Sequence, residues 1–369
     1  MPMPSSLALT RNGVLTLCGY GLRIAVERGH LGVEDCVGQE RRRARFSRIS
    51  KLKRLVVLGH AGTVSLAALR WLRDIGAAFV QIDADGQVVA ATGPTFVSDP
   101  SVVRGQVLAA DNGVALAIAR RLVSDKLKGQ LEVLRRLPEP KEARGRIRSA
   151  LALIERSDSL EHLRHYEADA AKAYWKAWEW VGIGFGRREA RRVPEHWLNF
   201  GSRTSPHTKS PRSAANPANA MLNYLYAILE AETRIACMAM GLDPGLGLYH
   251  ADKRYRDSLA CDLMEPVRPA VDSHLLQLLQ TRTFRKADFF ENRQGVCRVL
   301  PPVSQQLALT ARKWSRAVAP VVERVAQSLT TATSQRAVSY KLRIPMKSAT
   351  GSDLIRTLVP ADVGQLERA

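Results

Sequence analysis

The N-terminal part of the chain carries the hydrophobic pattern of short β-strands. Three runs of aliphatic and β-branched residues are separated by glycine-containing turns, at residues 14–18, 22–26 and 79–82. The pair Asp85-Gly86 then predicts a hairpin turn, with residues 88–89 in the return strand. One helix is expected in this part, over residues 65–73, because Ser65 can cap its first turn and Gly76 can end it.

After residue 100 the apolar residues recur at the spacing of helices. Residues 112–137 place aliphatic side chains at every third or fourth position, and we expect the lysines and arginines on the opposite face. Asn216-Pro217 predicts the start of another long helix, because asparagine is a good N-cap and proline is tolerated at the first helical position. This second helix should end at Gly241.

The stretch between these two patterns is interpreted as a linker. It contains Gly93, Pro94 and Pro100 and shows no strong periodicity. The length of 369 residues also favours two domains over one. We therefore predict an α+β protein with a small β-rich N-terminal domain (residues 1–92), a linker (93–105) and a larger all-α domain (106–369).

The charge of the chain points to its class of partner. There are 55 Lys and Arg against 35 Asp and Glu, a formal net charge of +20, so nucleic acid or an anionic membrane is expected. No run approaches the ~18 uncharged apolar residues of a membrane-spanning helix, which favours nucleic acid. The N-terminus lacks the charged start and apolar core of a signal peptide, and the 5 cysteines show no paired spacing. We therefore expect a cytoplasmic protein with reduced thiols.

Three clusters of basic residues are candidates for contact with a phosphate backbone. The first runs from Arg41 to Arg54. The second and third comprise Arg187, Arg188, Arg191 and Arg192, and Arg203, Lys209 and Arg212. We predict DNA contact for the second and third clusters because they lie in the helical half, and such contacts position a protein without reading sequence. The alternative is a solvated charged face or, for the first cluster, contact with an acidic protein partner.

Acidic residues and one histidine form a candidate site in this basic chain. Asp262 and Glu265 are three positions apart, so they share one face of a predicted helix, and two close carboxylates repel unless a cation lies between them. His250 lies on the loop that enters this helix. Oxygen and nitrogen ligands without a thiolate suit Mg²⁺ or Mn²⁺ better than a structural zinc ion. The residues alone leave open a solvated face in which the acids pair with Arg256 or Arg268.

Glu167 carries a weaker signal of its own. It precedes several alanines on a predicted helix, and such small residues would let a neighbouring element pack closely against it. An ordinary surface glutamate is the alternative, and the residues alone do not separate Glu167 from Glu161 or Glu179. No phosphate-binding glycine loop and no activated Ser or Cys nucleophile is recognisable, so the nucleophile would come from the substrate.

Several blocks, taken in order, resemble one known family. They are residues 19–31 (GYGLRIAVERGHL), 62–72 (GTVSLAALRWL), 167–175 (EADAAKAYW), 216–227 (NPANAMLNYLYA), 241–244 (GLDP), His250 and 258–269 (SLACDLMEPVRP). Over residues 14–326 the chain is similar to the large metal-dependent subunit of the CRISPR spacer-acquisition complex, the adaptation integrase.

The resemblance implies a β-rich N-terminal domain that dimerises and an α-helical catalytic domain. It implies Glu167, His250 and Glu265 as catalytic residues that bind Mg²⁺ or Mn²⁺, with Asp262 as an acidic position of the same metal site. The implied activity is insertion of short double-stranded DNA fragments into a CRISPR array, with a small ferredoxin-like companion protein as scaffold.

One residue departs from the family pattern. Pro266 directly follows the second carboxylate, where the family has a helix-compatible residue, so the helix should kink or have a short last turn. Three other functions remain as alternatives: a metal-dependent nuclease on branched DNA, a related transposon integrase, and a non-catalytic architectural DNA binder.

Overall fold

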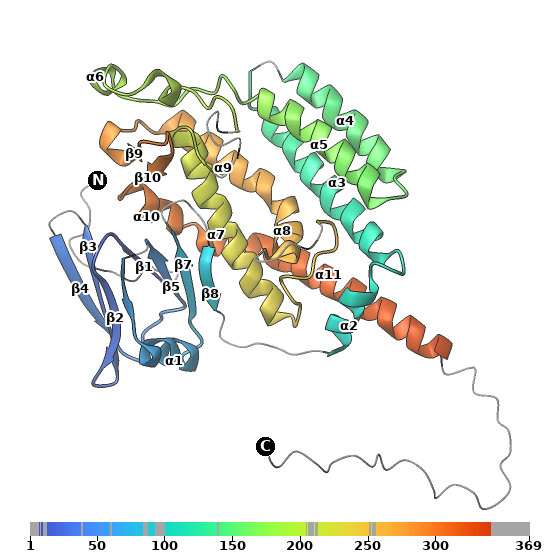
Figure 1. Ribbon diagram of the computed structural model, residues 1–369, viewed down its shortest axis with the longest axis horizontal. Coiled ribbons are helices and arrows are strands. Elements are labelled where there is room, and N and C mark those ends of the chain that lie inside the picture. The colour runs from blue at the N-terminus through green and yellow to red at the C-terminus, as the bar shows by residue number, and fades with distance from the viewer. Residues whose placement is uncertain are drawn as a thin grey trace, which may run out of the picture.

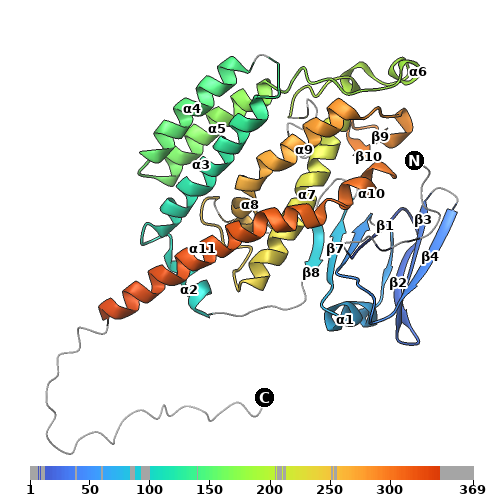
Figure 2. The same cartoon turned by 180° about the vertical axis from the view of Figure 1, so that it is seen from behind.

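The computed structural model is drawn in Figures 1 and 2. The described residues are 7, 9, 13–37, 40–59, 61–83, 88–92, 100–138, 140–203, 205, 210, 213–250, 252 and 256–340, the last nine of these by their backbone alone. A β-rich N-terminal part lies beside a larger helical part, so the predicted fold class is confirmed.

A four-stranded sheet forms the boundary between the two parts. Its strands are β1 (Val14–Cys18), β5 (Arg54–Leu58), β7 (Ala78–Ile82) and β8 (Val88–Thr92), in the order β1-β5-β7-β8. The first three are parallel, and β8 runs antiparallel to β7. Because side chains alternate along a strand, Val56 and Leu58 join the core of the helical part, whereas Leu55 and Val57 join the N-terminal core. The return strand predicted at 88–89 is confirmed, and the turn residues 84–87 lie outside the described residues.

A second sheet completes the N-terminal part. Its order is β4-β3-β2-β6, with β4 (Glu40–Phe46), β3 (His30–Val37), β2 (Leu22–Glu27) and β6 (Gly62–Val64). The predicted helix is α1 (Leu66–Asp74), and its N-cap is confirmed because Oγ of Ser65 accepts a hydrogen bond from the amide of Ala68 at 3.1 Å. Trp71 of α1 donates from Nε1 to the carbonyl of Gly29 (3.0 Å), which fixes the helix to the turn between β2 and β3.

The first part of the first basic cluster lies in strand β4, which the sequence pattern did not predict. Arg42 of β4 points inward and donates to the buried carboxylate of Asp35 at 2.8 and 2.5 Å. Arg41 and Arg43 point to the other face, where both pair with Glu34 at 3.6 and 3.2 Å. Asp35 thus neutralises Arg42 within the sheet, whereas Arg41 and Arg43 share the single charge of Glu34.

The helical part surrounds one long central helix. Its elements are α2 (Pro100–Leu108), α3 (Val114–Leu134), α4 (Lys141–Glu155), α5 (Leu160–Lys176), α6 (Arg187–Ala190), η1 (Glu195–Trp197), α7 (Pro217–Ala239), α8 (Ser258–Met264), η2 (Glu265–Val267), α9 (Arg268–Thr281), η3 (Lys286–Asp288), β9 (Phe289–Glu291), β10 (Cys297–Val299), α10 (Val303–Ala308) and α11 (Ala311–Tyr340). α3, α4 and α5 pack side by side, and α7 lies between α9 and α11 (Figures 1 and 2). The small β9-β10 sheet is an exception to the all-α prediction.

The central helix α7 begins and ends where the sequence predicts. Oδ1 of Asn216 accepts from the amide of Asn219 at 3.0 Å, and Pro217 occupies the first turn. Gly241 follows the helix with φ of 74°, a backbone conformation that favours glycine.

The junction between the two parts differs from the predicted linker. α2 begins at Pro100, so residues 100–105 are helical, and residues 93–99 lie outside the described residues. Arg54 of β5 and the buried Glu232 of α7 form an ion pair of 2.8 Å across the junction. None of the helices in the described part of the chain combines the length and the apolar character that crossing a bilayer requires.

Candidate active site

Three helical segments bring the candidate residues together. α5 carries Glu167, and α3 packs against both α5 and the run formed by α8, η2 and α9. α8 ends at Met264, and Glu265 opens the 3₁₀ turn η2 with Pro266 directly after it. Of the two outcomes expected at Pro266, a kink or a short last turn, the structure shows the second, because α8 gives way to a 3₁₀ turn there.

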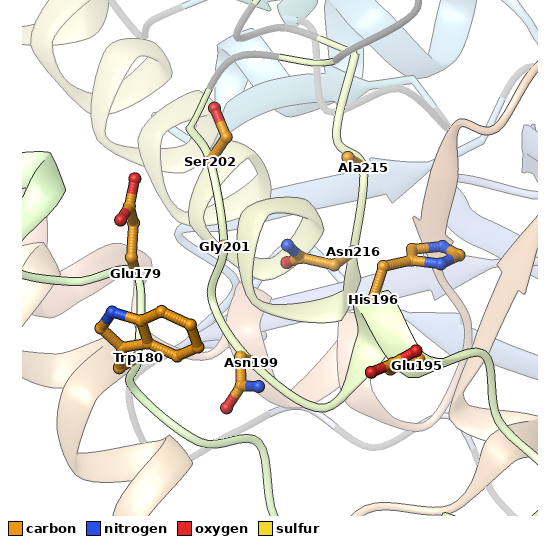
Figure 3. A pocket seen from close by; sticks show the side chains of 9 residues that line it. All are labelled: Glu179, Trp180, Glu195, His196, Asn199, Gly201, Ser202, Ala215 and Asn216. Atoms are coloured by element: carbon orange, nitrogen blue, oxygen red, sulfur yellow. The ribbon is translucent and has the colours of Figure 1, made fainter.

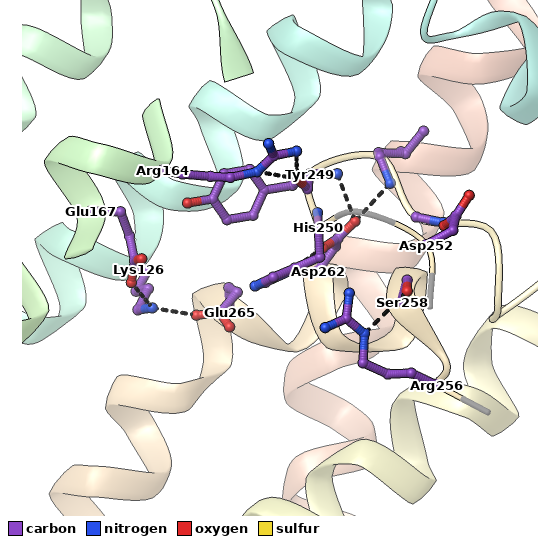
Figure 4. Close-up of polar contacts among 12 residues, drawn as sticks. Lys126, Arg164, Glu167, Tyr249, His250, Asp252, Arg256, Ser258, Asp262 and Glu265 are labelled. Atoms are coloured by element: carbon purple, nitrogen blue, oxygen red, sulfur yellow. Dashed lines mark hydrogen bonds and ion pairs between the residues drawn. The ribbon is translucent and has the colours of Figure 1, made fainter. Parts of the chain in front are cut away.

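The carboxylates of Glu167 and Glu265 both contact one buried lysine. Nζ of Lys126 lies 2.5 Å from Oε1 of Glu167 and 2.5 Å from Oε2 of Glu265 (Figure 4). The three side chains are only 10%, 18% and 4% exposed, respectively, so water screens these ion pairs little. The chain itself thus supplies a cation between two predicted metal ligands.

Sequence reasoning missed Lys126 because it placed the basic residues of α3 on the solvent side. The side chain instead lies on the buried side of α3, four positions after Leu122 and eight after Ile118. A charged residue in the apolar stripe of an amphipathic helix is the signal that could have found it.

Neighbouring positive charges hold Glu265 in its ionised form. Burial raises the pKa of Glu265, but Arg268 and Lys126 outweigh this effect and hold the pKa at about 2. Nε of Arg268 lies 3.2 Å from Oε1, so the two cations contact different oxygens of the carboxylate. For Lys126 the directions are reversed. Burial lowers its pKa, but the negative charges of Glu265 and Glu167 outweigh this effect and raise the pKa above its usual value. The pairing with Arg268 that was weighed from the sequence is therefore present, in a buried setting.

Asp262 holds the loop that carries His250. The carboxylate is fully buried and accepts the amides of Leu248, Tyr249 and His250 at 2.7, 2.8 and 3.0 Å. It also lies 2.5 Å from Nδ1 of His250 (Figure 4). An ionised carboxylate only accepts hydrogen bonds, so Nδ1 carries a proton, and in the neutral imidazole Nε2 then keeps its lone pair. Because both oxygens of Asp262 already have partners, this geometry favours a positioning role over the predicted metal contact.

Arg164 ties the His250 loop to the helix of Glu167. It lies one turn before Glu167 on α5 and donates to the carbonyl of Tyr249 from Nε and Nη2 at 3.0 and 2.6 Å. Burial raises the pKa of Tyr249, and the negative charges of Glu167 and Glu265 raise it further, which places this ring near both carboxylates. Arg164 had no distinguishing signal in the sequence.

The described residues approach a metal site without completing one. Among them, no three His, Cys, Asp or Glu side chains gather closely enough to hold one ion. The donor set nevertheless fits a divalent cation of the Mg²⁺ class, because Glu167 and Glu265 converge on one cation position. His250 also lowers the pKa of Glu265, which places the imidazole near this carboxylate. The metal-binding and catalytic roles of Glu167, His250 and Glu265 remain predictions.

A cavity of about 640 Å³ opens beside this cluster. Glu167 and Arg268 line one part of it, and Trp175, Arg203 and Tyr226 line another. The guanidinium of Arg268 lies 4.9 Å from the centre of the Tyr226 ring, and the hydroxyl of Tyr226 donates to the buried Asp272 at 2.6 Å. Arg268 is thus fixed at the wall of a cavity next to the two acids.

A second cavity of about 580 Å³ lies next to the first and shares Glu179 and Ser202 with it. Figure 3 shows Glu179 and Trp180 on one side of it and Glu195 and His196 on the other. The Trp180 side chain is 80% exposed. The two cavities are therefore neighbours, and Glu167 lines the first of them.

The basic residues predicted to contact DNA fall into different settings. The second cluster is exposed and lies in and just after α6, at the outer end of the segment that follows α5 (Figure 1). Its members are Arg187, Arg188, Arg191 and Arg192. Arg203 is half-buried instead and donates to the amide oxygens of Asn219 and Asn223 at 3.2 and 2.7 Å. Lys209 and Arg212 lie outside the described residues.

Comparison with known proteins decides the family. The family profile described as "CRISPR associated protein Cas1" matches residues 15–308. The chain belongs to the Cas1 family. Relatives named "CRISPR-associated endonuclease Cas1" include one from Leptospira interrogans, 32% identical over 48% of this chain and 67% of its own. Another, from Archaeoglobus fulgidus, is 29% identical over 77% of this chain and 83% of its own.

Solved structures show that the Cas1 fold extends over most of the chain. A casposase bound to its integration product has a TM-score of 0.71 at 21% identity and covers 86% of this chain and 91% of its own. The Cas1 protein of Thermotoga maritima has a TM-score of 0.63 at 17% identity and covers 92% and 99%. The family resemblance predicted from the sequence blocks is therefore confirmed.

Proposed function

We propose that this protein is a divalent-metal-dependent DNA strand transferase and endonuclease that inserts short DNA fragments into a CRISPR array. The observation that carries the proposal is the convergence of Glu167 and Glu265 on one cation position. His250 is oriented beside them by Asp262. Membership of the Cas1 family supports spacer acquisition as the biological role.

The residues that would hold the metal are Glu167, His250 and Glu265. A bound Mg²⁺ or Mn²⁺ would supply Lewis-acid chemistry at the target phosphodiester and would favour deprotonation of the incoming 3′-hydroxyl. Asp262 keeps the proton on Nδ1 of His250, so that Nε2 remains available as a ligand.

The reaction exchanges one phosphodiester bond for another. The 3′-oxygen of the fragment attacks phosphorus in the target strand, the bond to the leaving 3′-oxygen breaks, and that oxygen takes up a proton. Arg268 lines the cavity beside Glu167 and is placed to stabilise negative charge on the phosphate during attack. If water replaces the 3′-hydroxyl, the same site performs hydrolysis.

The DNA and the protein partners are part of the same proposal. The exposed arginines around α6 would contact the backbone of double-stranded DNA. Insertion at two strands requires two active sites, which a homodimer formed through the N-terminal part would supply. We also include a small ferredoxin-like companion protein as partner; one structure of similar fold is a Cas6-RT-Cas1–Cas2 complex, with a TM-score of 0.65. Such an assembly would act on cellular DNA in the cytoplasm.

A strand-transfer assay tests the proposal. A labelled short duplex with free 3′-hydroxyls is mixed with a supercoiled plasmid that carries a repeat, with Mg²⁺ or Mn²⁺, and with or without a candidate companion. We expect label to join the plasmid only with metal and a 3′-hydroxyl. Separate Glu167→Gln, His250→Ala and Glu265→Gln variants should lose joining and retain DNA binding, and normal joining by all three would refute the site.

The same assay separates the alternatives. Cutting without joining would indicate a nuclease on branched DNA, and joining into a plasmid without a repeat would favour a transposon-type integrase. Binding with neither cutting nor joining, in the presence of a companion, would indicate an architectural DNA binder.

A further inference from the structure

Lys126 occupies the position between two acidic side chains that a divalent cation would need. Its ammonium contacts one oxygen of Glu167 and one oxygen of Glu265, and its side chain is buried between α3, α5 and η2. Among the described residues, Glu167 has no other ion pair within 4 Å. Arg268 contacts the other oxygen of Glu265 and does not bridge the two acids.

The ammonium and a divalent cation cannot contact these two oxygens at the same time. Metal–oxygen distances for Mg²⁺ are about 2.1 Å, so an ion bound to both oxygens would lie on top of Nζ of Lys126. Two positive charges at that separation in a buried site repel strongly. Metal binding therefore requires Nζ to leave both carboxylates, whereas Arg268 can remain on Oε1 of Glu265.

We propose that Lys126 is a tethered counter-ion that competes with the divalent metal for Glu167 and Glu265, and so sets the metal concentration at which the site fills. This inference rests on the proposed function, because it takes these acids as the metal ligands. In the metal-free protein, Lys126 keeps the two carboxylates together instead of letting them repel. When the metal enters, the flexible four-carbon side chain of Lys126 moves aside.

Direct metal binding tests this role without relying on activity. Mn²⁺ is titrated calorimetrically into the full-length wild-type protein and into Lys126→Met. Lys128→Met is the matched control, since it removes the same charge from the same helix at an exposed position. Lys126→Met should bind Mn²⁺ about tenfold more tightly than the wild type, because the competing cation is gone. Lys128→Met should stay within about twofold of the wild type, as expected for a solvated charge.

Two further variants separate competition from a purely structural effect. Lys126→Arg keeps a cation on the acids, so it should not bind Mn²⁺ more tightly than the wild type. Without metal, Lys126→Met should melt at a lower temperature than Lys128→Met, and Mn²⁺ should raise its melting temperature by more. If Lys126→Met fails to fold without metal, two rescues are tested: addition of Mn²⁺ and the second substitution Glu167→Gln. Recovery of folding by either rescue supports the proposal, and failure of both overturns it.

The outcomes distinguish this inference from the proposed function. If the wild type binds Mn²⁺ at a site that Glu167→Gln removes, but Lys126→Met binds it no more tightly than Lys128→Met, the role of Lys126 is overturned and the metal site stands. If neither the wild type nor the Lys126 variants show Mn²⁺ binding that depends on Glu167, the metal site itself is overturned. The proposed role of Lys126 is then overturned as well.

Discussion

Gly129 of α3 and Pro269 of α9 touch so closely that no side chain fits between them. A Cβ atom built on Gly129 would lie 2.8 Å from Cβ and 2.9 Å from Cγ of Pro269. Gly129 follows Lys126 by one helical turn, and Pro269 follows Glu265 by four residues. This approach of the two backbones brings Lys126 within reach of Glu265.

Replacing Gly129 with alanine should therefore destabilise the protein. In a helix with free space, Gly→Ala stabilises by up to about 1 kcal/mol. At Gly129 the added carbon meets a rigid proline ring, so overpacking should win and lower the free energy of unfolding by ~1–3 kcal/mol. Strand transfer should fall as well, since α3 is pushed away from Glu265.

Gly145 of α4 provides the matched control for this substitution. A Cβ atom built there meets nothing within 4 Å, so Gly145→Ala should be neutral or stabilising. Urea denaturation of both variants measures the difference. Equal stability of Gly129→Ala and Gly145→Ala would show that α3 and α9 can separate at no cost.

Asp262→Asn should impair the site without removing a proposed ligand. An amide can accept hydrogen bonds on only one side, so it would lose partners among the amides of residues 248–250 and the ring of His250. We expect strand transfer to fall by about 10–100-fold, as for other groups that orient a metal-binding histidine. Stability should fall by ~1–3 kcal/mol, because buried donors are left unpaired.

Asp252 offers a control on the same loop for this comparison. It is exposed and, among the described residues, accepts the amide of Gly247 at 2.8 Å, so Asp252→Asn should change activity little. Strand-transfer rates at saturating Mn²⁺ and the Mn²⁺ affinity should both be measured. Wild-type values for Asp262→Asn in both measurements would contradict the positioning role.

The sequence predicted the members of the site better than their partners. The spacing of Asp262 and Glu265 predicted a shared helix face, yet one side chain holds the His250 loop and the other contacts Lys126. α8 ends at Met264, between Asp262 and Glu265, and Glu265 opens the 3₁₀ turn η2 with Pro266 directly after it. Lys126 is 41 residues from Glu167 along the chain, and such a contact depends on how α3 and α5 pack.

Strand β4 is an element of the fold that the sequence pattern did not predict. An arginine-rich run carries no hydrophobic alternation, so a pattern based on apolar residues misses the strand. The alternation exists in the pairing instead, because Arg42 faces Asp35 across the ladder between β3 and β4 and is buried with it. Strands β1, β2 and β7 were predicted because their buried side chains are aliphatic or aromatic.

The buried carboxyl group of Glu232, at the junction between the two parts of the protein, should make stability depend on pH. Burial raises the pKa of Glu232 from 4.5 to about 7, although Arg54 opposes this shift. A carboxyl group with a raised pKa stabilises the folded state fully below pH 4.5, and this contribution is lost as pH rises to about 7. The difference between those limits is about 3 kcal/mol.

Glu232→Gln removes this titration, so the difference in stability between the variant and the wild type should change with pH. Relative to the wild type, the variant should gain stability between pH 5 and pH 8, since the glutamine never ionises. Urea denaturation at four pH values across this range measures the difference in free energy of unfolding. A difference that stays constant with pH would show that Glu232 is already ionised in the folded protein at pH 5.

The exposed arginines around α6 should carry a share of DNA affinity that the first basic cluster does not. A variant with alanine at Arg187, Arg188, Arg191 and Arg192 loses four unburied charges that follow the helix of Glu167. Its DNA affinity should fall, and the slope of log affinity against log salt concentration should decrease by roughly one unit for each lost phosphate contact.

The control is Arg41→Ala with Arg43→Ala, because these two side chains already pair with Glu34. Fluorescence anisotropy with a labelled duplex at several salt concentrations measures both quantities. A larger loss of slope in the β4 variant than in the α6 variant would move the DNA-binding surface to the N-terminal sheet.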